Sequence, residues 1–423
     1  MHNTLKRLII NFTSIFSANF ISRFLAFIYF TILARYLTTQ EMGLYGYLFV
    51  YIGVGNILTD FGINRILVRD VARDHSLAQN YLKHIVTLRM FLSLVSAILL
   101  YLIILMLPKD TKVLLLAPLA LLSIFPYSLS FTLDYTLKAR EKMRSSAISM
   151  ISFESLKILL LLLVIWLDFR LIGILSMLIL AFILYCLILY SFISQDGLRL
   201  GWGFSLPAWK NILTASLPFA LFNVMEIIHS RLNLFLLKNL LNDDVITGYY
   251  FIAYQFIVVI LILPAASSIV IQPMFSRHFA LSTDKIHNEY ILFLKIMSVL
   301  GLFIAIMVFI FSDFIIVLAF GTKYIPSINI LKILTISIFF LFLQYANSAF
   351  LIASDIKWRI LIFSLLQLSI NFISNLVLIP KFGAVGAAWA HNISTAGGFI
   401  LFSIMIRLYM QSIRSSYNNN IQV

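Results

Sequence analysis

Charged side chains are scarce in this chain, and their scarcity decides its class. Asp, Glu, Lys and Arg together make up 11% of the 423 residues, whereas 61% are hydrophobic. A soluble domain carries roughly 25% charged residues, because its water-exposed surface is largely formed by polar and charged side chains. This composition excludes an ordinary soluble protein. It predicts an all-α protein that crosses a lipid bilayer many times.

Cysteine and recognisable catalytic motifs are also nearly absent. The single cysteine, Cys186, lies in an apolar run, so an internal disulfide and a cysteine-based metal site are excluded. The chain contains no HExxH, P-loop, nucleophile elbow or Rossmann fingerprint. We therefore expect no metal, no other cofactor and no enzymatic activity.

Positive charge is in excess, at 31 Lys and Arg against 17 Asp and Glu. These cations are scattered among short loops rather than gathered in a patch, so membrane topology explains them and nucleic acid is not an expected partner. The apolar segment after Lys6 and Arg7 has about 25 residues, which is longer than a signal-peptide core. We expect it to be a retained first transmembrane span.

Twelve apolar segments are long enough to cross a bilayer. They cover residues 10–34, 42–64, 82–107, 113–137, 146–167, 171–194, 211–236, 247–274, 291–318, 328–353, 358–379 and 384–409. With the N-terminus inside, the cytoplasmic segments hold 18 Lys and Arg and the outer loops hold 7. This bias predicts a cell-membrane protein with both termini in the cytoplasm.

The two halves of the chain resemble each other. Gly43-Leu44-Tyr45 after the first span matches Gly248-Tyr249-Tyr250 after the seventh, and each follows a cation and a short acidic turn. Phe169 and Gly173 before the sixth span match Phe382 and Gly386 before the twelfth. Six helices separate the copies, so they repeat in parallel about an axis normal to the membrane.

This repeat predicts two six-helix bundles, at residues 1–194 and 211–423. The connection at 195–210 mixes Trp202, Phe204 and Trp209 with Arg199 and Lys210, a composition suited to the inner membrane interface. We expect it to be an interfacial linker. A substrate site is expected between the two halves.

Several stretches carry a family resemblance. They are LARYLTTQEMGLYGYLF at 33–49, DFGINRILVRDVAR at 60–73, LPFALFNVMEIIHSRLNLFLLKNLL at 217–241, GYYFIAYQFIVVILILPAASSIVIQPMFSR at 248–277, FGTKYIPSINILKILTI at 320–336 and NLVLIPKFGAVGAAWAHNIS at 375–394. Together they resemble the polysaccharide transporter family, the O-antigen-type flippases of the multidrug/oligosaccharidyl-lipid/polysaccharide (MOP) exporter superfamily. The chain departs from the family at Asn233, where members often carry an aspartate two residues after the arginine equivalent to Arg231.

The resemblance implies a fold and a substrate. The fold is two helix bundles related by a pseudo-two-fold axis, as in MATE transporters, which open alternately around a polar cavity. The substrate is a polyprenyl-diphosphate-linked oligosaccharide repeat unit that passes from the inner to the outer leaflet for surface polysaccharide biosynthesis. A polysaccharide polymerase and chain-length machinery are the implied partner proteins.

Polar residues form stripes on several spans that this substrate could use. Asn223, Glu226, His229, Ser230 and Asn233 share one face of the seventh span, from which Arg231 is displaced. Such a face cannot point at lipid, so it either lines water or packs against another helix.

Two other spans repeat the pattern. Asn56 and Asp60 lie on one face of the second span, and Gln367 and Asn371 on one face of the eleventh. These amides either contact sugar hydroxyls in a cavity or hold helices together.

Cations inside spans are the candidates for the diphosphate. Arg23 has no acidic residue within a helical turn, so it is the first candidate, with an interhelical partner such as Glu226 or snorkelling to the interface as alternatives. Arg231 is the second. Lys157 follows Glu154 by three residues, so this pair either neutralises itself or serves the substrate.

Arg65, Arg69 and Arg73 recur every four residues at the cytoplasmic exit of the second span. They would recruit an anionic headgroup, although membrane topology alone would also place cations there.

Two rival functions share these features. A cation-coupled drug or small-molecule antiporter of the same superfamily would have the same fold, and its cavity would favour acids over the cations present here. A membrane glycosyltransferase or polymerase would need a large outer loop with catalytic residues, and no outer loop is that long.

Overall fold

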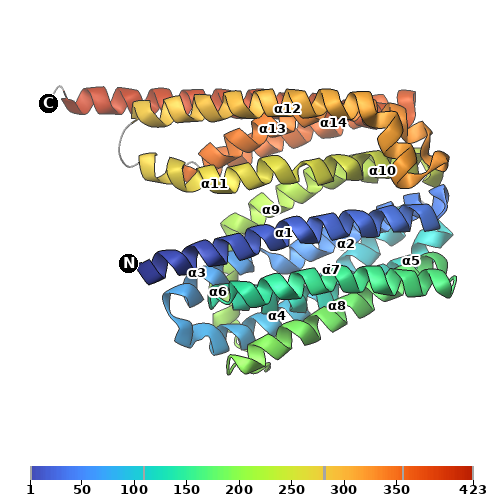
Figure 1. Cartoon of the computed structure of the whole chain (residues 1–423), viewed down its shortest axis with the longest axis horizontal. Helices are drawn as coiled ribbons and strands as arrows, with labels where there is room; N and C mark the ends of the chain where they lie inside the picture. The colour runs from blue at the N-terminus through green and yellow to red at the C-terminus, as the bar shows by residue number, and fades with distance from the viewer. Residues whose placement is uncertain (1, 108–109, 280–282, 355–356, 422–423) are drawn as a thin grey trace. The chain divides into compact units, whose positions relative to one another are not determined.

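The computed structural model describes residues 2–107, 110–279, 283–354 and 357–421, which form helices joined by short connections. The helices are α1 (His2–Tyr36), α2 (Thr39–Asp60), α3 (Ile63–Arg73), α4 (Ala78–Met106), α5 (Thr111–Leu122), α6 (Ile124–Ala139), α7 (Met143–Trp166), α8 (Arg170–Gln195), α9 (Leu206–Leu241), α10 (Asp244–Ile260), α11 (Ile262–Phe279), α12 (Thr283–Phe320), α13 (Pro326–Ala353) and α14 (Lys357–Ile421) (Figure 1). Two short 3-10 helices, His75–Leu77 and Thr322–Tyr324, complete the described elements. No strand occurs among these residues, so the all-α prediction is confirmed.

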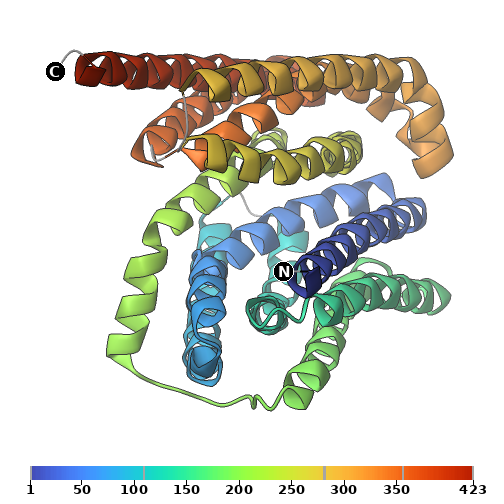
Figure 2. The ribbon, with the colours of Figure 1, turned by 60° about the vertical axis from the view of Figure 1, so that its left-hand side comes forward.

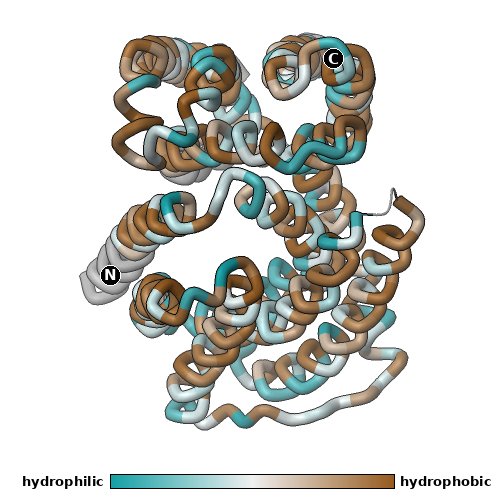
Figure 3. Tube along the Cα trace, turned by 90° about the vertical axis from the view of Figure 1, so that its right-hand side faces the viewer, coloured by the Kyte–Doolittle hydropathy of each residue, from teal (hydrophilic) through white to brown (hydrophobic). Residues whose placement is uncertain are grey.

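The helices have the length and composition of membrane spans. Within the described residues, ten helical runs qualify, and the bent pair Leu206–Leu221 and Asn223–Leu241 makes eleven. The run Arg359–Ser412 contains both of the last two predicted spans, and Gly383 interrupts the helix between them with φ 59° and ψ −133°. Hydrophobic residues dominate the helices throughout, as Figure 3 shows in brown.

The second predicted span differs from the expected single segment. Phe61 and Gly62 take positive φ values of 44° and 73°, which end α2 and start α3 in a new direction. Residues 65–73, expected only as the exit from the membrane, are helical. α3 buries Ile63, Leu67 and Val71, so its exposed face is left to the charged residues.

Two further spans break next to a proline. α5 gives way to α6 at Ser123, and α10 gives way to α11 at Leu261. Pro126 and Pro264 are each the third residue of the following helix, where the missing amide hydrogen costs no helical hydrogen bond.

The chain separates into two compact units, Met1–Ile227 and Ile228–Val423. In the first unit α1 packs along α7, α6 packs against α4 and α8, and α3 covers α6. In the second unit α13 is central and contacts α10, α11, α12 and α14. The division falls inside α9, and the expected boundary at 195–210 remains a prediction.

The connection after α8 is extended, as Figure 2 shows, and it is fastened to α4. The side chain of Gln79 donates to the Arg199 carbonyl at 2.8 Å and accepts from its amide at 2.9 Å. The Gly203 amide donates to Thr87 Oγ1 at 2.9 Å. Trp202 and Phe204 remain 75% and 71% exposed.

Asp196 anchors the beginning of this connection. Arg140 and Lys142, from the turn between α6 and α7, approach its carboxylate to 2.7 and 3.1 Å. Burial opposes ionisation of Asp196, but the hydrogen bonds from these two cations outweigh it, so the pKa of its carboxyl lies below its usual range.

The break at Gly62 allows a direct test by Gly62→Ala. A Cβ there would lie 2.7 Å from Phe219 Cβ and 2.9 Å from the Ser216 carbonyl oxygen, in addition to the cost of a positive φ. Gly197→Ala is the matched control, because Gly197 also has a positive φ of 81° but no atom within 4 Å of the added Cβ.

We expect Gly197→Ala to lose about 1 kcal/mol of unfolding free energy and Gly62→Ala to lose at least about twice as much. Thermal unfolding of the detergent-purified variants measures both. Equal losses would contradict the close approach of α9 to the α2–α3 break.

Candidate functional site

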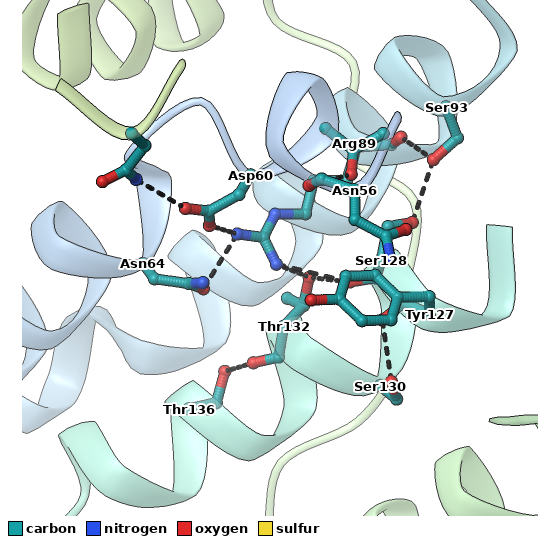
Figure 4. A network of polar contacts seen from close by, with 12 residues as sticks. Asn56, Asp60, Asn64, Arg89, Ser93, Tyr127, Ser128, Ser130, Thr132 and Thr136 are labelled. Carbon is teal, nitrogen blue, oxygen red and sulfur yellow. Dashed lines mark hydrogen bonds and ion pairs between the residues drawn. The ribbon is translucent and has the colours of Figure 1, made fainter. Parts of the chain in front are cut away.

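A buried arginine organises the polar residues of the first unit. Arg89 of α4 has a side chain only 1% exposed, and its Nη2 donates to Asp60 Oδ1 at 2.6 Å and to Asn64 Oδ1 at 2.8 Å. Its Nη1 donates to Thr132 Oγ1 at 3.0 Å and to the Ser128 carbonyl at 3.3 Å (Figure 4). Four helices, α2, α3, α4 and α6, therefore meet at one guanidinium.

The charge balance explains why an arginine can lie here. A buried ion is tolerated only when a counter-ion and further hydrogen bonds replace its water. Asp60 supplies the charge, and Asn64, Thr132 and Ser128 supply neutral acceptors. The second carboxylate oxygen of Asp60 accepts a long 3.4 Å bond from Asn223 of α9, so this helix also reaches the cluster.

A cavity of about 120 Å³ opens beside this cluster. Its polar lining includes Asn56, Asp60, Asn64 and Arg89. Its aromatic lining is Tyr127, Phe131 and Tyr135, which follow one another at four-residue spacing along α6. Polar groups and aromatic rings thus meet in one small cavity, which is the usual character of a small-molecule pocket.

The structure brings together three of the expected site residues here, Asn56, Asp60 and Asn223. The sequence analysis missed Arg89 and the aromatic wall. A signal existed: Arg89 and Asp60 lie near the same ends of two consecutive antiparallel spans and have opposite charges. The rings of α6 gave no signal, because an aromatic stripe at helical spacing is usually a packing surface.

A second cluster of amides and imidazoles lies in the second unit. Asn375 Nδ2 donates to Asn233 Oδ1 at 2.7 Å and to Asn371 Oδ1 at 2.6 Å. His229 lies 3.4 Å from the side-chain nitrogens of both Gln367 and Asn371. The predicted stripes of the seventh and eleventh spans therefore face each other within the pair α9 and α14.

Burial shows what these amides do in this conformation. Asn371 and Asn375 have no exposed surface, and Asn233 is 3% exposed. Asn233 Nδ2 also donates to the Tyr250 hydroxyl of α10 at 3.1 Å. The amides thus donate to one another across helix contacts, although Asn375 Oδ1 has no partner. Such contacts fit their expected alternative role in holding membrane helices together.

His391 extends this cluster to the second helix within α14. Its ring lies 6.3 Å from that of His229 and meets Tyr254 of α10 edge to face at 5.3 Å. His391 is 2% exposed, and neither ring nitrogen has a hydrogen-bond partner.

The remaining candidates are distributed along other helices. Lys157 pairs with Glu154 at 2.7 Å, so the neutralising i, i+3 pair is present, and its ammonium also lies over the rings of Tyr29 and Phe153. Arg23 of α1 is exposed, as is Glu226 of α9, and the part of the chain that the structure describes contains no ion pair between the two. Arg231 is partly buried on α9.

The basic face of α3 is accessible, since Arg65, Arg69 and Arg73 are all exposed. Arg69 pairs with Asp70 at 2.6 Å, and the Arg65 guanidinium lies 5.0 Å from the centre of the Phe219 ring. Among the described residues, no group of three or more His, Cys, Asp or Glu could hold a metal ion.

Solved structures with the same arrangement of helices are transporters. An inward-facing multidrug resistance MATE family transporter of the MOP superfamily has a TM-score of 0.73 and 14% identity, over 92% of this chain and 95% of that chain. A MOP superfamily transporter from Pyrococcus furiosus has a TM-score of 0.68 and 14% identity, over 96% of each chain. A eukaryotic MATE transporter, AtDTX14, has a TM-score of 0.66 and 12% identity, over 98% and 99%.

The protein thus has the fold of MATE transporters of the MOP superfamily, as the sequence predicted. Its sequence matches the profile of the family described as "Polysaccharide biosynthesis protein" over residues 8–279, which is more than half of the chain. The chain belongs to this family. Among curated protein sequences, none matches it.

The Arg89 cluster predicts an asymmetric response to substitution. Arg89→Met would leave the largely buried Asp60 carboxylate without its cation, and we expect it to lower the free energy of unfolding by about 3–5 kcal/mol. The double variant Arg89→Met/Asp60→Asn should recover part of this loss, because no unpaired charge remains.

Thermal unfolding in detergent measures both variants. Arg69→Met is the control, since it removes an arginine from an exposed pair and should cost less than about 1 kcal/mol. Similar losses for Arg89→Met and Arg69→Met would contradict the role of Arg89.

Proposed function

We propose that this protein is a flippase. It moves polyprenyl-diphosphate-linked oligosaccharide repeat units from the inner to the outer leaflet of the cell membrane by alternating access. Its products enter surface polysaccharide biosynthesis, where a polymerase and chain-length machinery use them. Both termini lie in the cytoplasm, and the transport step itself involves no catalysis by this chain.

Membership of the polysaccharide biosynthesis family is the observation that carries the proposal, and the fold supplies a transporter scaffold for it. The charge of the proposed substrate adds support, because the protein must shield this charge from the hydrocarbon. A diphosphate crossing hydrocarbon unaided would meet a Born cost of order 20 kcal/mol per ion. The protein must therefore offer cations along a polar route while the lipid tail stays in the bilayer.

Cations of both units are assigned to this route. Arg65, Arg69 and Arg73 form an exposed basic face on α3 that would attract the headgroup from the cytoplasmic side. Arg23 is exposed inside an otherwise apolar helix, where a charged residue is a functional candidate by default. It is assigned to the diphosphate, with Arg231 and Lys157 as further candidates.

Polar side chains are assigned to the sugars. Asn56, Asp60 and Asn223 contribute from the first unit. Glu226, His229, Asn233, Gln367 and Asn371 would contribute in a conformation that opens the amide cluster. Amide and hydroxyl groups both donate and accept, as sugar hydroxyls require.

A cation-coupled antiporter of small molecules is the second candidate, because multidrug transporters share this fold. The charge distribution favours the flippase. Asp60, an acid that could bind a cationic drug, already has Arg89 as its partner at 2.6 Å.

Arg23→Ala tests the proposal in a strain whose own copy of the gene is deleted. We expect surface polysaccharide to fall by at least about tenfold while the protein remains in the membrane, because the diphosphate loses its cation. Arg23→Lys should retain part of the export, since it keeps the charge but loses the fork of donors.

Arg144→Ala is the control, as Arg144 is an exposed arginine at the start of α7 outside the assigned route. Immunoblotting of membranes and quantification of surface polymer give the two readouts. Normal export by Arg23→Ala would remove Arg23 from the site.

A further inference from the structure

The cavity beside Arg89 has the chemistry of a sugar subsite. Its lining includes the aromatic rings of Tyr127, Phe131 and Tyr135 on α6, which are side chains of the kind that meet the C–H face of a pyranose. The same cavity is lined by carboxylate, amide and guanidinium groups that match hydroxyls. The two sets of side chains are on helices of one unit, so the pocket does not depend on the second unit.

Two polar atoms at this cavity have no hydrogen-bond partner. They are Asn56 Oδ1, an acceptor, and Arg89 Nε, a donor. The second oxygen of Asp60 has only the 3.4 Å contact with Asn223, and the Asp60 side chain is 22% exposed. Asn56 Oδ1 and Arg89 Nε themselves have almost no accessible surface. The Asp60 carboxylate is therefore the group that a sugar hydroxyl, which both donates and accepts, reaches directly.

The charges in the cluster favour an uncharged sugar over an acidic one. The guanidinium of Arg89 is balanced by Asp60, and its terminal nitrogens are already occupied by four acceptors. An acidic sugar would bring its carboxylate towards Asp60 without finding a free cation. An uncharged sugar meets no such opposition.

The size of the cavity limits how much of the substrate enters. At about 120 Å³ it holds the volume of roughly four waters, since each water takes about 30 Å³ in the liquid. One partly inserted ring fits this space, and two do not.

We propose that this cavity is a subsite for one uncharged pyranose of the translocated oligosaccharide, held between the α6 rings and the group Asn56, Asp60 and Arg89. The assignment rests on the proposed function for the identity of the whole substrate. It goes beyond that function by naming the part of the substrate that binds to the first unit. Tyr127 and Asn56 would then determine which sugar is bound.

Saturation-transfer NMR on the full-length protein in nanodiscs tests this directly. The probes are methyl glucopyranoside and methyl N-acetylglucosaminide as uncharged sugars, and methyl glucuronide as the acidic one. We expect saturation transfer to the uncharged probes and a weaker signal for the glucuronide.

Two variants locate the binding. Tyr127→Leu removes an aromatic ring and Asn56→Ala removes an amide that both line the cavity, and each should weaken binding of the uncharged probes by about tenfold. Tyr190→Leu is the control, because Tyr190 is partly buried on α8 of the same unit and does not line the cavity. Melting temperatures show whether each variant is folded, and Asn56→Ala retains the test if Tyr127→Leu is not.

Three results would overturn the subsite. They are no binding of either uncharged probe to the unaltered protein, binding by both folded cavity variants as strong as that of the unaltered protein, or a stronger signal from the glucuronide. Polymer export in the same strains separates this proposal from the one on which it rests. A protein that exports polymer normally but binds no uncharged probe refutes the subsite and leaves the flippase intact. A protein that binds the probes but is not needed for polymer export refutes the flippase instead.

Discussion

The buried ion pair between Arg89 and Asp60 is the interaction on which the first unit depends. Asp60 is the last residue of α2, immediately before the two positive φ angles that turn the chain into α3. Arg89 therefore ties the α2–α3 break to α4 and α6. Asn223 brings α9 to the same carboxylate, and the bend of 43° in α9 lies next to it. Loss of any one partner would leave a buried polar group unpaired, at a cost in folding free energy. This cluster therefore fixes both the α2–α3 break and the edge of the cavity.

The sequence predicted the fold well because the membrane restricts a chain to few solutions. Apolar runs of span length must be helical in lipid, so the helices followed from composition and spacing. The bend at Phe61 and Gly62 did not follow. Phe61 has no intrinsic preference for positive φ, and α9, far along the chain, packs closely against the neighbouring Gly62.

The candidate site could be predicted only in part, for a related reason. Helical periodicity grouped Gln367 with Asn371 and His229 with Asn233, because residues on one helix share a face whatever the tertiary structure. Which faces meet is a property of packing. Arg89 escaped notice because its partner is on another helix, and the rings of Tyr127, Phe131 and Tyr135 look the same in sequence whether they fill a core or line a pocket.

The central claim is that this chain moves finished lipid-linked repeat units across the membrane. The most direct measurement is to extract polyprenyl-diphosphate-linked oligosaccharides from a strain that lacks the gene and to determine on which side of the membrane they lie. The account predicts that complete repeat units accumulate facing the cytoplasm while the surface polymer disappears. Intact surface polymer without such accumulation would contradict it, and would leave the small-molecule antiporter as the better explanation of the fold.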